Sequence, residues 1–278
     1  MSKKIQKKYA LMLLILAVAA LALSISMACV LYFNHNSTTQ LTDGVMHTVI
    51  MALIAPVFAS LGVAAAMLVK KKTFIEHEGE GKMNVFSSIA CINVAIVGVI
   101  LSMSYMLGSY ADPLKALLSQ TSKTPYYSNL LSVVLAFCVS LVMAFMVFSK
   151  KGPYSPVRQL PLLVFAMCYG VRLHTDMSNL LMNTRRMVSV LAVCMLLLFI
   201  TAKIRVLCYK SAQIYYIVSG FLAVGALAVS GFSGVMLNIL GAASDGIQLW
   251  FYAYELALAI YVFAELFKYS YEARQEDK

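Results

Sequence analysis

Hydrophobic residues occur along this chain in eight long runs, separated by short polar segments. Most runs exceed the roughly 20 residues that an α-helix needs to cross about 30 Å of hydrocarbon. Backbone amides in lipid must bond to one another, and the runs lack the alternation of barrel strands, so helices are the only reasonable spanning structure. The pattern predicts an all-α integral membrane protein, a single-domain bundle of about eight transmembrane helices, at residues 9–33, 45–69, 84–108, 127–149, 160–182, 185–206, 211–236 and 248–268.

Two of these runs carry residues that bear on helix packing. Pro56 falls inside the second run, where it removes one backbone hydrogen bond and is expected to kink the helix. In the seventh run Ala226, Ser230 and Gly234 recur every four residues, which places small side chains on one helix face. We therefore expect the seventh helix to approach its neighbours closely and to lie at the centre of the bundle.

Composition agrees with the membrane class: 61% of the residues are hydrophobic, 12% are charged, and the mean hydropathy is +0.81. The net charge of +10 is no sign of nucleic-acid binding, because the basic residues alternate with the connections between runs. By the positive-inside rule both termini are predicted to be cytoplasmic, with the plasma membrane as the expected location. All but five of the 22 basic residues then face the cytoplasm, where they meet anionic lipid; the five are Lys115, Lys123, Arg172, Arg185 and Arg186.

The first run resembles a signal peptide in following four lysines, but its length of about 25 residues favours a retained span. The six cysteines fall within runs or at their ends, without a CxxC pair or metal-ligand spacing. We expect neither disulfides nor zinc, and the sequence predicts no cofactor.

The fifth run is interrupted by the polar segment Val171 to Arg186. The apolar residues before it, Leu160 to Val171, reach only about 18 Å at 1.5 Å per residue. The fifth helix is therefore predicted to continue through the charges to Met182, which places Arg172 near the middle of the bilayer.

At 100° per residue, Arg172, Asp176, Asn179 and Asn183 form one stripe on that helix. Charged side chains inside a membrane usually face the bundle interior or a water-filled path. The stripe is therefore a candidate ligand site. His174 lies on another face and is left out of it.

Glu255 is the second candidate, about 10 Å below the outer surface in the eighth run. It needs a partner in the membrane. Arg172 is the best candidate by depth, and Arg185 or Arg186 could reach down from the start of the sixth run. An internal ion pair that only orients two helices is an open alternative to a ligand or ion path.

The leading hypothesis is an outward-facing polar pocket that binds or transports a small anionic or zwitterionic solute. Arg172, Arg185 and Arg186 would attract the anionic group, Asp176 would hold a cationic one, and Glu255 would be a counter-charge or proton carrier. A sensor or assembly subunit that contacts another membrane protein is the main alternative. A lipid-modifying enzyme using Asp176 and Glu255 as acid and base is a weaker one.

Overall fold

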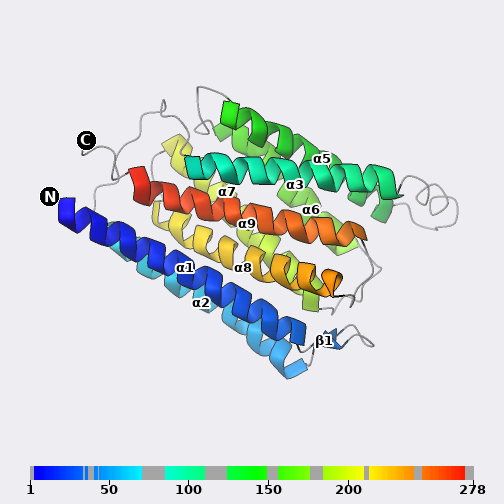
Figure 1. Cartoon of the computed structure of the whole chain (residues 1–278), viewed down its shortest axis with the longest axis horizontal. Coiled ribbons are helices and arrows are strands. Elements are labelled where there is room, and N and C mark those ends of the chain that lie inside the picture. The colour runs from blue at the N-terminus through cyan, green and yellow to red at the C-terminus, as the bar shows by residue number, and fades with distance from the viewer. Residues whose placement is uncertain are drawn as a thin grey trace.

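The computed structural model describes most of the chain, at residues 3–33, 35–36, 41–42, 44–70, 85–109, 124–148, 156–175, 184–209, 213–240 and 246–272. These residues are almost entirely helical (Figure 1). The long helices are α1 (Lys3–Phe33), α2 (Gly44–Lys70), α3 (Val85–Ser109), α5 (Thr124–Phe148), α6 (Leu160–Thr175), α7 (Thr184–Tyr209), α8 (Gln213–Ile239) and α9 (Gly246–Glu272). A short antiparallel pair, β1 (His35–Asn36) and β2 (Leu41–Thr42), joins α1 to α2, and the 3-10 helix η2 (Pro156–Gln159) precedes α6.

Seven of the described helices are long and apolar enough to span a membrane, which indicates a multi-pass membrane protein. The expected number was eight. The exception is α6, whose 16 residues extend about 24 Å. The four residues of η2 add about 8 Å in front of it, at roughly 2 Å per residue. Together η2 and α6 match the thickness of the hydrocarbon core, so the expected helical continuation to Met182 is not required by length; residues 176–183 lie outside the described part.

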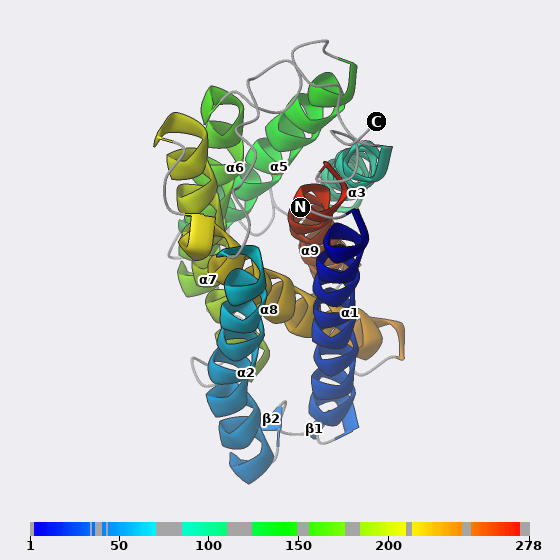
Figure 2. The ribbon, with the colours of Figure 1, turned by 90° about the vertical axis from the view of Figure 1, so that its left-hand side faces the viewer.

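Six of the helices form a closed ring, in which each packs against the next in the order α3, α5, α6, α7, α8, α9 and back to α3. The remaining two, α1 and α2, pack outside this ring against α8. Figure 2 shows α5 and α6 on the side of the bundle far from α1 and α2. The beginning of α1 and the end of α9 lie at the same end of the bundle (Figure 1).

The small residues of α8 place this helix at the centre, as the sequence predicts. Ala226 and Ser230 are buried, and α8 contacts α1, α2, α7 and α9. A Cβ at Gly225 would meet the ring of Phe58 on α2 at 2.3 Å, and one at Gly234 would meet Tyr252 on α9 at 2.2 Å. Glycine is therefore what lets large side chains of two neighbours lie directly on the α8 backbone. Pro56 lies inside α2, as expected.

Candidate functional site

Polar side chains meet inside the ring at two levels, which we call the upper cluster (Asn129, Tyr169, Arg172, Ser189, Ser230 and Glu255) and the lower cluster (Gln159, Lys203, Tyr261 and Glu265). Both clusters join α9 to α6 or α7, helices that are not its neighbours in the ring. Glu255 and Glu265 are ten residues apart on α9, which corresponds to about 15 Å along its axis. The polar contacts therefore cross the ring interior at two depths.

Glu255 is the acidic member of the upper cluster, and only 1% of its surface is exposed. The hydroxyl of Tyr169 on α6 donates a hydrogen bond of 2.6 Å to Glu255 Oε1. The other carboxylate oxygen, Oε2, is buried and receives no hydrogen bond from the described residues. The hydroxyls of Ser189 on α7 and Ser230 on α8 lie beside this carboxylate and are hydrogen-bonded to each other at 2.7 Å.

Arg172 is the basic member of the upper cluster and is 5% exposed. Its guanidinium carbon lies 3.7 Å from the ring centroid of Phe251 and 5.6 Å from that of Tyr169. Its Nε donates a short hydrogen bond to Asn129 Oδ1 on α5. Guanidinium groups stack well on aromatic faces while keeping their N–H groups in the plane. The aromatic rings thus hold the guanidinium of Arg172 inside the bundle through cation–π contacts.

The rings around Arg172 belong to an aromatic column between α6 and α9. Tyr169 stacks on Phe165 at 5.5 Å and on Phe251 at 5.4 Å, with interplanar angles of 11° and 8°. Phe165 in turn meets Tyr254 edge to face at 5.2 Å. Tyr169 is therefore held on both faces, and its hydroxyl can point at Glu255 without losing packing.

The structure brings together two of the seven candidate residues, because the charge of Arg172 is close enough to act on Glu255, with Tyr169 contacting both. Arg172 lies in the last turn of α6 as described, and the residues that follow, 176–183, lie outside the described part. Arg186 is half-buried, and its Nη2 donates a short hydrogen bond to the backbone oxygen of His174. Four candidates cannot be placed: Asp176, Asn179 and Asn183 lie outside the described residues, as does the side chain of Arg185.

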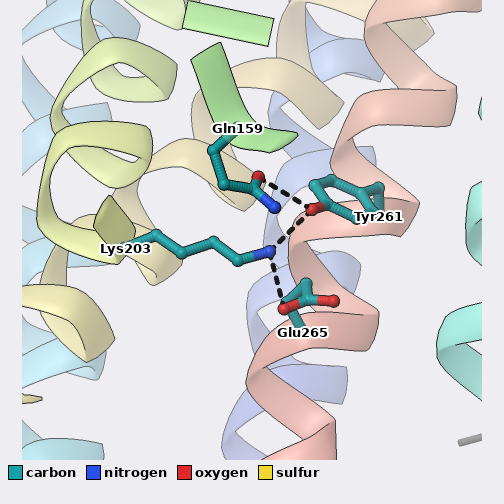
Figure 3. A network of polar contacts seen from close by, with 4 residues as sticks. All are labelled: Gln159, Lys203, Tyr261 and Glu265. Carbon is teal, nitrogen blue, oxygen red and sulfur yellow. Dashed lines mark hydrogen bonds and ion pairs between the residues drawn. The ribbon is translucent and has the colours of Figure 1, made fainter. Parts of the chain in front are cut away.

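The lower cluster contains an ion pair that the sequence analysis missed. Lys203 Nζ lies 2.8 Å from Glu265 Oε2 and donates a 2.6 Å hydrogen bond to the hydroxyl of Tyr261 (Figure 3). The Tyr261 hydroxyl donates to Gln159 Oε1 at 3.3 Å. Lys203 is one of the basic residues that we expected to face the cytoplasm between the sixth and seventh runs, and the structure shows it buried within α7. The sequence did contain a signal for this ion pair, because Lys203 falls inside the predicted span 185–206 and Glu265 inside the predicted span 248–268.

The two clusters differ in what they can do chemically. In the lower cluster the lysine and glutamate are in direct contact, so their charges cancel locally. In the upper cluster Glu255 accepts a hydrogen bond from Tyr169 and Arg172 donates one to Asn129, so a buried anion and a buried cation lie near each other. Such an arrangement suits a ligand that carries charge.

Metal-binding groups give no further lead. The described residues contain no group of three His, Cys, Asp or Glu side chains that could hold a metal ion, and none of the six cysteines forms a disulfide there. No protein-family model, curated protein or solved structure matches this chain.

Proposed function

We propose that this membrane protein binds a small anionic or zwitterionic solute inside the six-helix ring, at the upper cluster, and transports it across the plasma membrane. The observation that carries the proposal is the burial of Arg172 against Phe251. The nearby Glu255 is hydrogen-bonded to the hydroxyl of Tyr169. The distribution of basic residues supports an orientation with both termini in the cytoplasm.

Arg172 and Glu255 would each recognise a different charged group of the solute. The guanidinium of Arg172 would bind a carboxylate or phosphate of the solute, for which its planar set of donors is suited. Glu255 would balance an ammonium group of a zwitterion or take up a proton. Arg185 and Arg186 begin α7, and we propose that they attract the anion to the entrance.

Side-chain contacts across the interior of the helix ring favour movement of a solute through it. The two polar clusters and the aromatic column connect α9 to α6 and α7 through side chains. Contacts of this kind can open while the neighbouring helix pairs stay packed. The upper and lower clusters would then close the two ends of one path in turn.

The test is a thermal-shift screen of the purified protein against classes of small carboxylates, phosphates and amino acids. A ligand should raise the melting temperature of the wild type, and Arg172→Ala and Glu255→Gln should each abolish this shift. Arg205→Ala is the matched control, because Arg205 is an exposed arginine on α7. An unchanged shift in both site variants would contradict the proposal.

A further inference from the structure

Three oxygen-bearing side chains converge where α7, α8 and α9 meet. Ser189, Ser230 and Glu255 are respectively 0%, 2% and 1% exposed. Each comes from a different helix, and the two serine hydroxyls are 2.7 Å apart. The hydroxyls also lie beside the Glu255 carboxylate. The oxygens therefore form one compact group that water does not reach.

Glu255 Oε2 lies beside the serine hydroxyls but accepts no well-formed hydrogen bond from them. Its partner atom Oε1 receives the Tyr169 hydroxyl, but Oε2 is buried and accepts no hydrogen bond from the described residues. One of the two serine protons is already engaged in the bond between the serines. A buried carboxylate oxygen without a partner is costly, so this atom is suited to a ligand that carries positive charge.

We propose that Glu255 Oε2 and the hydroxyls of Ser189 and Ser230 bind a monovalent cation, Na⁺. Carboxylate and hydroxyl oxygens are hard ligands of the kind that alkali and alkaline-earth ions prefer over transition metals. The net charge of the site favours a monovalent ion over a divalent one. Arg172 is close enough for its charge to act on Glu255, and the two together are neutral, so Na⁺ alone adds one positive charge to this dry site and a divalent ion adds two, which makes the monovalent ion less costly.

The cation would also couple to the solute, and this part rests on the proposed function. Arg172 and Glu255 together are neutral, so an anionic solute on Arg172 alone would leave one uncompensated negative charge inside the ring. A Na⁺ ion on Glu255 restores neutrality. Each ligand therefore strengthens the binding of the other, by an equal factor in both directions.

The experiment measures equilibrium binding of radiolabelled Na⁺ to the purified protein, with choline chloride holding the ionic strength constant. Binding should saturate, and it should be displaced by unlabelled NaCl but not by additional choline chloride. Ser230→Ala and Ser189→Ala should each weaken binding by about tenfold or more, since even partners outside the first ligand shell act on that scale. Glu255→Gln should abolish it.

Two further variants make the result specific. Ser132→Ala should leave Na⁺ binding unchanged, because Ser132 is an equally buried serine whose hydroxyl bonds to the Ser128 backbone of its own helix. Arg172→Gln should raise the affinity for Na⁺, because it removes a positive charge near the site. This variant keeps the test informative if Glu255→Gln does not fold.

The proposal is overturned if the wild type binds no Na⁺ saturably, or if the serine variants bind it as well as Ser132→Ala does. Stabilisation by acidic pH with no response to Na⁺ would also overturn it, since the site then takes a proton. The outcome is separable from that of the solute screen, because Na⁺ binding is measured without solute. Na⁺ binding that Glu255→Gln abolishes would support the cation site even if no solute shifts the melting temperature.

Discussion

The hydroxyl of Tyr169 on α6 donates a 2.6 Å hydrogen bond to Oε1 of Glu255 on α9, and this bond crosses the interior of the ring. Both residues are almost fully buried, at 3% and 1% exposure. The same tyrosine stacks on Phe251, and the guanidinium of Arg172 lies over the aromatic ring of Phe251. Tyr169 thus positions the acidic and the basic residue of the upper cluster at once.

Replacing Tyr169 with Phe separates these two roles, because the ring stays and the donor is lost. We expect Tyr169→Phe to destabilise the protein by about 1 to 3 kcal/mol, the cost of leaving a buried acceptor without its partner. The measurement is unfolding in detergent. Tyr215→Phe is the control, since Tyr215 is 71% exposed, and it should change stability by less than about 0.5 kcal/mol. Equal effects of the two variants would show that the Tyr169 bond contributes nothing.

The ion pair of the lower cluster can be tested by replacing Lys203 and Glu265 separately and together. Lys203→Met removes the ammonium that lies 2.8 Å from Glu265 and should destabilise the protein by about 3 to 5 kcal/mol. Adding Glu265→Leu should recover most of this loss, because apolar residues of similar volume often replace a buried ion pair without cost. Unfolding of the two single variants and the double variant measures the coupling. A double variant as unstable as the sum of the singles would contradict the pairing.

Two glycine-to-alanine substitutions test helix packing, because one should lower the stability of the protein and the other should not. A Cβ at Gly225 would meet ring atoms of Phe58 at 2.3 to 2.5 Å, so Gly225→Ala should destabilise by about 1 to 3 kcal/mol. At Gly170 the nearest atom is Val193 Cγ1 at 3.5 Å, an ordinary contact. Gly170→Ala should therefore be neutral or stabilise by up to about 1 kcal/mol, since alanine favours the helix. Thermal unfolding compares them, and an unaffected Gly225→Ala would refute the close approach of α2 and α8.

Cysteine labelling tests whether α6 crosses the membrane. In a background without the six native cysteines, Val157→Cys and His174→Cys introduce exposed thiols at opposite ends of η2 and α6. An impermeant maleimide added to intact cells should label position 174 and leave position 157 unlabelled until the membrane is permeabilised. Labelling of both positions in intact cells, or of neither, would contradict a crossing.

Much of the fold could be predicted because lipid imposes one length on every span. The predicted span 84–108 corresponds to α3 at Val85–Ser109, and the predicted 248–268 lies within α9 at Gly246–Glu272. The small face around Ala226 and Ser230 likewise predicted the central place of α8, since small residues permit close approach. For the predicted span 160–182, the beginning agrees with α6 at Leu160, the preceding η2 was not predicted, and the predicted end lies outside the described residues.

The candidate site could be predicted only in part. Arg172 and Glu255 were found because charge is rare in a span. Lys203 was missed because a charge near the end of a run looks like the beginning of a loop. Tyr169 and Ser189 carry no signal in the sequence, since their role depends on which helix faces which, and the order of helices around the ring is not encoded in their periodicity.

The burial of α8 has a consequence for how the protein is made. Of the seven spanning helices in the described chain, α8 is the most enclosed, with 78% of its span buried, and α9 follows with 56%. These two are also the least hydrophobic of the seven, so each has the weakest drive to leave the translocon for lipid on its own. The helices that enclose them, α1, α2, α3 and α7, are all synthesised earlier. We therefore expect integration of α8 and α9 to depend on a surface that the earlier helices have already assembled in the bilayer.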